Sequence, residues 1–124
     1  MFFCFFVQYG ILLMDIRYHS RKLEKSVESL KAMQRHYGNM AKKVDIRLQQ
    51  FSAASNLEKL IHLNGLKCHE LHADRCGELS VRISPNHRIV FRPDHEPLPE
   101  KKDGGLDWKQ VTAIVITEIA VDYH

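Results

Sequence analysis

The 124-residue sequence is poor in cysteine and lacks the signature motifs of several enzyme classes. Its three cysteines, Cys4, Cys68 and Cys76, are odd in number and widely spaced. This argues against a secreted disulfide scaffold and favours free thiols in a reducing cytosol. There is no phosphate-binding loop, GxSxG elbow, HExxH helix or CxxC pair, which excludes the enzyme classes built on those motifs.

The composition lacks any strong bias. Hydrophobic residues make up 44% and charged residues 27%, which is typical of a soluble globular protein and excludes disorder and fibrous repeats. A chain of 124 residues fits one domain with one core.

Residues 1–13 lack charge altogether. The run is shorter than the roughly 20 residues of a membrane-spanning helix, and it lacks the basic start and cleavage site of a signal peptide. We therefore expect no membrane partner. An extra strand or an interfacial anchor are alternatives, but we interpret residues 1–13 as an apolar extension from a start chosen too early, with Met14 as the natural start of a domain over residues 14–124.

Charge is distributed unevenly along the chain. Residues 17–47 hold nine Lys or Arg and three acids, whereas residues 93–124 hold three Lys and seven acids. This asymmetry indicates a basic face for a polyanion such as nucleic acid, with a solvated helix surface as the plainer alternative.

Apolar residues at helical spacing predict two helices that pair as a hairpin. Ser20 is a candidate cap for a helix that Gly38 ends, and Asn39 is a candidate cap for the next. The first stripe is Leu23, Val27, Leu30 and Tyr37, and the second is Met40, Val44, Leu48 and Phe51. Residues 55–58 match a capping box, with Ser55 as cap, for a short third helix through Leu63.

After Gly65 the spacing of the apolar residues changes from the helical period of 3.6 to the strand period of 2. A short strand is expected at residues 15–19, further strands at 79–83 and 88–92 with a turn at Pro85-Asn86, and a central strand at 111–121 after a loop over 93–106. If Ile89 and Phe91 face the helices, Arg88 and Arg92 line the open face. The sequence therefore predicts an α+β fold, with an N-terminal strand and a helical hairpin packed on an antiparallel sheet.

The remaining candidates for chemistry are histidines and arginines. They lie in residues 68–75, in the turn at residues 86–88 and in the last three residues, Asp122-Tyr123-His124. Histidine moves protons near neutral pH, and arginine binds phosphate oxygens and stabilises charge that grows in a transition state. These residue types are those of a metal-free ribonuclease, so we expect no cofactor.

Residues 14–124 resemble the HigB-type killer toxins of the RelE/ParE superfamily. The resemblance rests on the order of short motifs: Asp15-Ile16-Arg17-Tyr18 with residues 20–25, Cys68-His69-Glu70-Leu71, Asp74-Arg75, Gly77, Asn86-x-Arg88-Ile89-x-Phe91 and the closing Asp122-Tyr123-His124. It implies a RelE-like domain that is neutralised by a helix-turn-helix antitoxin and that, once released, cuts messenger RNA on the ribosome without a metal.

The resemblance also implies roles for single residues. Arg88 corresponds to the phosphate clamp, His124 to a proton-transfer residue positioned by Asp122, and His69 to an acid/base or electrostatic residue. Tyr123 is expected to stack on a base and Arg75 to contact the RNA backbone. Arg82 and Arg92 join them on the open face as RNA-binding residues, unless all three strand arginines only solvate that face.

The sequence departs from the family pattern at three positions. His72 stands where many relatives have lysine, and Glu78 and Leu79 stand where they have an aromatic pair. His72 is a candidate general acid, whereas Glu78 would repel phosphate if it faced the site. In a regular strand, His69 and His72 would point to opposite faces, so a strand end or a bulge is needed to bring them together.

Three alternatives remain open. A zinc site would use Cys68, His69, His72 and Cys76, although their spacing matches no common zinc knuckle. A toxin-fold module weakened at His72, Glu78 and Leu79 would bind antitoxin and RNA or ribosome without cleaving. Action on gyrase, as in ParE-like members, is disfavoured by the closing Asp-Tyr-His.

Overall fold

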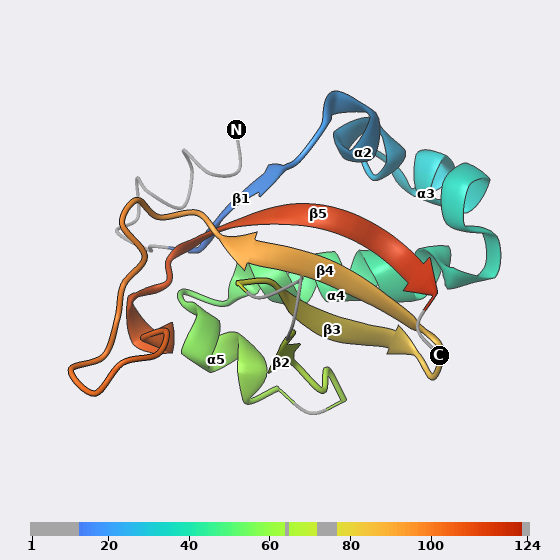
Figure 1. The fold of residues 1–124 in the computed structure, drawn as a ribbon. Helices are drawn as coiled ribbons and strands as arrows, with labels where there is room; N and C mark the ends of the chain where they lie inside the picture. The colour runs from blue at the N-terminus through green and yellow to red at the C-terminus, as the bar shows by residue number, and fades with distance from the viewer. Residues whose placement is uncertain (1–12, 64, 72–76, 123–124) are drawn as a thin grey trace.

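The computed structural model describes residues 13–63, 65–71 and 77–122, and their centre is a twisted five-stranded sheet (Figure 1). The strands lie in the order β1-β5-β4-β3-β2. Their bounds are β1 Asp15–Tyr18, β2 His69–Glu70, β3 Leu79–Ser84, β4 His87–Pro93 and β5 Ala113–Asp122. The α+β architecture is confirmed. Residues 1–13 were expected to form an extension, and of these only residue 13 lies within the described part.

The sheet is mixed, because β1 pairs with β5 in parallel while the other neighbouring strands pair antiparallel. The expectation of a purely antiparallel sheet is therefore wrong at one edge. Parallel neighbours require a long crossover connection, and nearly the whole chain lies between β1 and β5. Alternation along a strand carries no information about which strand becomes its neighbour.

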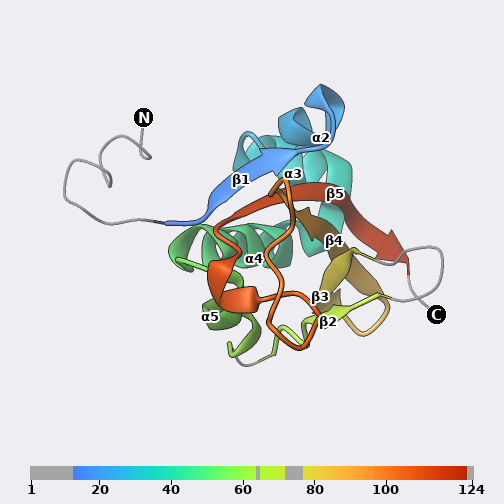
Figure 2. The same cartoon turned by 60° about the vertical axis from the view of Figure 1, so that its left-hand side comes forward.

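The helices are α2 Arg21–Ser26, α3 Leu30–Tyr37, α4 Ala41–Ala53 and α5 Leu57–Ile61. Helices α4 and α5 cover one face of the sheet, while α2 and α3 lie near the edge strand β1 and its neighbour β5 (Figures 1 and 2). We call the opposite face of β3, β4 and β5 the open face. Over β3 and β4 it carries no helix of the described part, whereas α2 contacts β5. Within these same ranges, no helix is long and apolar enough to cross a membrane.

The predicted helix over residues 21–37 is interrupted. Helix α2 ends at Ser26, and Ser29 starts α3 by accepting a hydrogen bond from the Ala32 N–H at 3.1 Å. Leu30, which the apolar stripe placed in the core, is 52% exposed. A serine that caps a new helix competes with continuation of the old one, and here the cap prevails.

The other helix boundaries agree with the sequence except at two caps and at the end of α5, which the sequence placed at Leu63 and which lies at Ile61. Ser20 caps α2 as expected, and Gly38, with a φ of 55°, ends α3. Asn39 does not cap α4, because a 3-10 turn, η1 (Gly38–Met40), precedes that helix. Asn56 rather than Ser55 caps α5, accepting from the Lys59 N–H at 3.0 Å.

The core lies between α4, α5 and the covered face of the sheet. The rings of Phe51 on α4 and Phe91 on β4 meet edge to face, with centroids 5.0 Å apart. Around them lie fully buried aliphatic side chains from three strands, namely Leu79, Val81, Ile83, Ile89, Ile114 and Ile116. As predicted, β4 therefore turns Ile89 and Phe91 toward the helices and Arg88 and Arg92 toward the open face.

Strand β5 does not run in regular register along β4. The pairing shifts between Arg88 and Val90 and again between Val90 and Phe91, so β5 carries extra residues at two places. Ala120 accordingly has a φ of 62°. Such bulges turn side chains away from strict alternation. One result is that Thr117 reaches across the open face, where its Oγ1 lies 3.1 Å from the Val90 carbonyl oxygen.

Candidate functional site

Arg88 is fixed in position on the open face at the start of β4. Its Nε donates to Ser80 Oγ at 2.6 Å, and its Nη2 donates to the carbonyl oxygens of Lys67 at 2.6 Å and Ser80 at 3.3 Å. Ser80 is completely buried, so it provides a rigid anchor. A guanidinium held in this way loses little side-chain freedom when it meets an anion.

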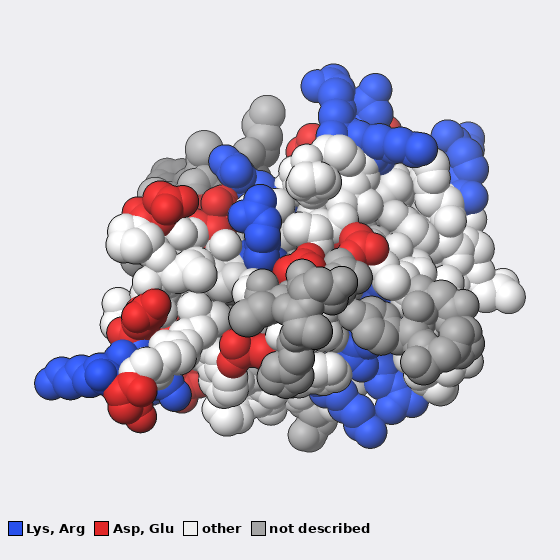
Figure 3. Space-filling view, viewed as in Figure 1, with Lys and Arg blue, Asp and Glu red and all other residues white. Residues whose placement is uncertain are grey.

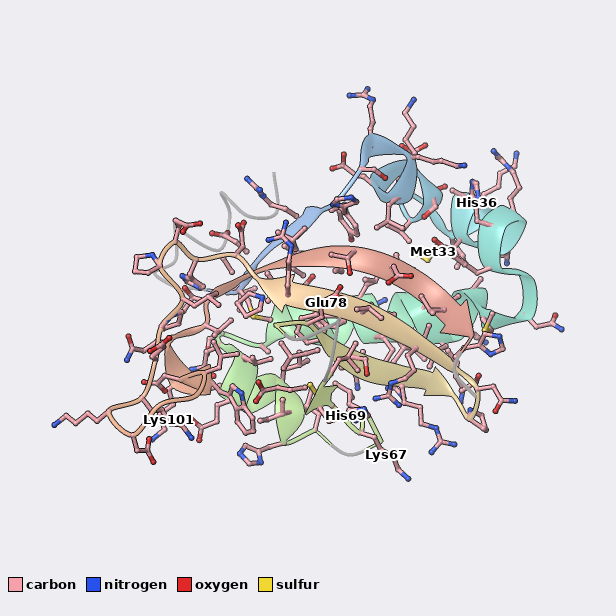
Figure 4. All side chains as sticks on the ribbon, viewed as in Figure 1. Met33, His36, Lys67, His69, Glu78 and Lys101 are labelled. Carbon is pink, nitrogen blue, oxygen red and sulfur yellow. The ribbon has the colours of Figure 1, made fainter. Side chains whose placement is uncertain are left out.

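His69 lies beside this guanidinium. It belongs to the short strand β2 (Figure 4), where it pairs with Ser80. Its Nδ1 is 3.4 Å from Arg88 Nη2. When Nδ1 accepts from Arg88, the proton of the neutral ring lies on Nε2. The imidazole is exposed and has a cation beside it. This is the geometry of a proton-transfer group next to an anion-binding group.

The Lys67 backbone completes the Arg88 site. Lys67 has a φ of 48°, in the left-handed region that residues other than glycine rarely adopt. Its carbonyl oxygen receives Arg88 Nη2 and also lies 3.3 Å from His69 Nδ1. The strained backbone therefore holds the acceptor on which both side chains converge.

Arg82 adds a second positive charge. It is the cross-strand partner of Arg88, and alternation along β3 places it on the open face. Like charges directly opposite each other are unfavourable in a sheet unless an anion lies between them. Behind β3, Arg47 of α4 donates to the Arg82 carbonyl oxygen at 2.7 Å. Burial, and secondarily the charge of Arg82, lowers the pKa of Arg47.

Cys68 is not a nucleophile at this site. Burial raises its pKa to about 12, an effect that Arg88 opposes and Glu70 reinforces. A thiol with so high a pKa stays protonated at neutral pH. Of the other candidate zinc ligands, His72 and Cys76 lie outside the described residues, and no group of three His, Cys, Asp or Glu within those residues is placed to hold a metal.

The described end of β5 lies next to Arg88. Val121 pairs with Arg88 and Asp122 with His87. The backbone of Asp122, the first residue of the Asp-Tyr-His motif, therefore lies beside the backbone at the start of β4. The Arg88 guanidinium extends to the other side of β4, over β3 toward Lys67 and His69. The Asp122 side chain, Tyr123 and His124 lie outside the described part of the chain, as do His72 and Arg75.

Of the three departures from the family pattern, the two within the described residues occupy different surfaces. Leu79 is buried in the core at 1% exposure, so it does not reach the open face. Glu78 lies over that face, where its Oε2 receives the Thr117 hydroxyl at 3.2 Å (Figure 4). Arg92 is exposed and pairs with Val115, four residues along β4 from Arg88, or about 13 Å at the rise of a strand.

The structure therefore brings His69, Arg82 and Arg88 together and leaves Arg92 apart. Sequence reasoning missed Ser80 and Lys67, which fix the guanidinium. Ser80 occupies an open-face position, but nothing in the sequence marks it as fully buried. Figure 3 shows basic side chains gathered over α2 and α3 and again beside β2 and β3, with acidic and neutral atoms between them.

No protein-family model and no curated protein sequence matches this chain. Solved structures do match. A YoeB/ParE toxin from Agrobacterium tumefaciens aligns at 16% identity and a TM-score of 0.52, covering 89% of this chain and 100% of that one. A YoeB dimer from Staphylococcus aureus aligns at 19% identity and a TM-score of 0.52, covering 89% of this chain and 98% of that one. A YafQ variant from E. coli aligns at 12% identity and a TM-score of 0.50, covering 87% of this chain and 92% of that one.

These likenesses define the class of fold. The helices packed on one face of a five-stranded mixed sheet form the RelE/YoeB-like toxin fold. The matching structures are described as a YoeB/ParE toxin, a YoeB dimer and a YafQ variant, and two further matches are YoeB-YefM complexes from Staphylococcus aureus.

Proposed function

We propose that this protein is the toxin of a type II toxin-antitoxin system and acts as a ribosome-dependent mRNA endonuclease of HigB type. The fold it shares with YoeB, ParE and YafQ toxins supports the toxin role. The observation that carries the enzymatic role is the approach of Arg88 Nη2 to His69 Nδ1, at 3.4 Å, on a sheet face that also carries Arg82.

The proposed reaction is metal-free cleavage by the ribose 2′-hydroxyl. A general base removes the 2′-hydroxyl proton, O2′ bonds to the adjacent phosphorus, and the bond from phosphorus to O5′ breaks as a general acid protonates the leaving oxygen. The products are a 2′,3′-cyclic phosphate and a 5′-hydroxyl end. Arg88 stabilises the negative charge that grows on the phosphoryl oxygens.

His69 and His124 are the proposed proton-transfer residues, with Asp122 positioning His124. Two sequence neighbours support this assignment: Asp122 pairs with His87, the residue before Arg88, and His124 follows Asp122 by two residues in the sequence. Tyr123 is proposed to stack on a base. His72 is proposed to take the role of the lysine of relatives, as a general acid.

The RNA backbone is proposed to follow the open face. Arg82, beside Arg88, contacts the scissile region, and Arg92 contacts the strand further along β4. Arg75 supplies a further backbone contact. Such contacts give affinity without sequence preference and weaken as salt rises.

The proposed regulatory partner is a small antitoxin of the helix-turn-helix type that covers this face in the cytosol. A YoeB-YefM complex among the structural relatives supports an antitoxin partner. Three cysteines without a dense spacing pattern agree with a reducing compartment.

The test is a translation reaction in which RNA ends are sequenced. Wild-type protein should generate new 5′-hydroxyl ends within codons on the ribosome, and Lys101→Ala, on an exposed loop, should act like wild type. Arg88→Ala should lower the rate of cleavage by about a hundredfold. Inhibition of translation without new ends would refute the nuclease.

A second candidate function is binding without cleavage. Glu78 favours this binding-only function. Its carboxylate contacts Thr117 of β5 on the open face, and a negative charge there repels phosphate. If the protein only binds, the wild type and the His124→Ala variant should inhibit translation to the same extent, and neither should generate 5′-hydroxyl ends. Restored cleavage in Glu78→Gln would assign the loss to this carboxylate.

A further inference from the structure

A hollow of about 200 Å³ opens between α2, α3 and β5, apart from the Arg88 site. Its walls include the aliphatic side chain of Leu23 and two neighbouring rings on α3, those of His36 and Tyr37, whose centroids are 6.2 Å apart at 48°. Figure 4 labels His36 on α3. Lys22 and His36 supply basic groups, and none of the residues that line the hollow is acidic. The remaining polar walls are the hydroxyls of Ser20, Ser26, Tyr37 and Thr117.

Hydrogen bonds within the protein fix the direction of three of these hydroxyls, those of Ser26, Tyr37 and Thr117. Ser26 Oγ donates its only proton to the Leu23 carbonyl oxygen at 2.6 Å, so the Tyr37 hydroxyl, 2.6 Å from Ser26 Oγ, must be the donor of that pair. The Thr117 proton is likewise used within the protein, since Oγ1 lies 3.2 Å from Glu78 Oε2 and 3.1 Å from the Val90 carbonyl oxygen. Both oxygens therefore offer only lone pairs to a ligand.

The hollow thus combines two hydrogen-bond acceptors, the Tyr37 and Thr117 oxygens, with two basic groups, Lys22 and His36. A ligand that fits both has N–H donors at one end and negative charge at the other. Adenine and cytosine carry an exocyclic amine, and guanine carries an amine beside a ring N–H. Uracil has one ring N–H between two carbonyl oxygens, which two acceptors repel. Exposed aromatic rings are also the usual platforms for unpaired bases.

We propose that this hollow binds one unpaired nucleotide of the RNA, with its phosphate at Lys22 and His36 and an amine-bearing base at Tyr37 and Thr117. The proposal rests on the RNA-directed function proposed above. Thr117 contacts Val90, which lies two residues along β4 from Arg88, and the Arg88 guanidinium reaches over β3 to Lys67 and His69. The hollow and the guanidinium therefore lie on the two sides of β4. An RNA strand that crosses the sheet is able to occupy both sites, and the hollow disfavours uridine at one position of the bound RNA.

The test uses RNA that resists cleavage. Heptamers of 2′-O-methyl cytidine and of 2′-O-methyl uridine lack the attacking hydroxyl, and their binding is measured by fluorescence anisotropy. Wild-type protein should bind the cytidine heptamer at least about fivefold more tightly than the uridine heptamer. The double variant Lys22→Gln/His36→Gln should weaken binding of both by about tenfold. Lys25→Gln/His62→Gln removes the same residue types outside the hollow and should weaken binding by less than about twofold.

A single hydroxyl tests the direction of the hydrogen bonds. Ser26→Ala removes the acceptor of the Tyr37 proton, so the freed hydroxyl is able to donate to a carbonyl oxygen. The preference for cytidine should then fall to about twofold or less, or turn toward uridine. Tyr37→Phe, which retains the ring, should lower it in the same way. Thermal unfolding of each variant confirms that it is folded.

The results separate this inference from the nuclease proposal. Equal wild-type binding of the two heptamers, or equal losses in the two double variants, overturns the hollow as a nucleotide site even if the protein cleaves RNA. A cytidine preference that depends on Ser26 and Tyr37 supports it even if no cleavage occurs, in which case only the nuclease fails.

Discussion

Arg88 donates from Nε to the buried hydroxyl of Ser80 at 2.6 Å, so a polar residue inside the sheet sets the position of a cation on its surface. Ser80→Ala should lower the rate of RNA cleavage by about tenfold, because the guanidinium loses one of its anchors. The free energy of unfolding should fall by about 1–2 kcal/mol. Cleavage assays and urea unfolding measure the two effects.

The matched control is Ser84→Ala on the same strand, where the lost hydrogen bond, 2.9 Å long, is to His87 Nδ1. Cleavage should change by less than about twofold, with a similar loss of stability. If Ser84→Ala impairs cleavage as much as Ser80→Ala, the anchoring role assigned to Ser80 is wrong.

Lys67 should respond to substitution through its backbone. Its φ of 48° costs about 1 kcal/mol in a residue with a Cβ, and glycine relieves that cost. Lys67→Gly is expected to raise the free energy of unfolding by about 0.5–1 kcal/mol, whereas Lys67→Val should lower it by more than 1 kcal/mol, at about the scale of β-branched strain. Chemical denaturation distinguishes these signs, and equal effects would contradict the strain.

The edge-to-face pair of Phe51 and Phe91 should dominate core stability. Phe51→Ala should lower the free energy of unfolding by about 3–5 kcal/mol, because it removes a fully buried ring. Ile46→Ala on the same helix, at a residue 47% exposed, should cost less than about 0.5 kcal/mol. Guanidinium unfolding of both variants provides the comparison.

Burial of Cys68 predicts a stability that falls in alkali. The pKa of its thiol rises from an ordinary 9.0 to about 12 on folding. Between these values the unfolded chain releases a proton that the folded chain keeps, so stability is fully present below pH 9 and declines toward pH 12. In a Cys4→Ser/Cys76→Ser background, native protein should react with iodoacetamide at pH 8 far more slowly than protein in urea. Equal rates would show that Cys68 is not shielded.

The sequence predicts those parts of the fold in which local pattern and final environment agree. The alternation of Leu79, Val81 and Ile83 with polar residues correctly indicates β3, and the same rule places Arg88 on the open face. The break before Leu30 escapes prediction, because an apolar stripe and a capping serine give conflicting signals. The parallel pairing of β1 with β5 joins segments too distant in sequence for any local pattern to reveal.

The sequence predicts which residue types form the candidate site but not the hydrogen bonds that hold them. The family motifs contain His69 and Arg88, and the structure places these two residues side by side. The anchors on Ser80 and on the Lys67 carbonyl depend on a left-handed backbone and on complete burial. Neither property has a signature in the residues themselves, because lysine at positive φ and serine at zero exposure are both uncommon.

The most direct test of the central claim is a double-mutant cycle on the rate at which ribosome-bound RNA acquires 5′-hydroxyl ends. His69→Ala and Arg88→Ala should each lower that rate by about a hundredfold. Because the two groups act on one phosphate, the double variant should be far less impaired than the product of the single effects predicts. Single variants that cleave within twofold of wild type, or effects that simply multiply, would contradict a shared site.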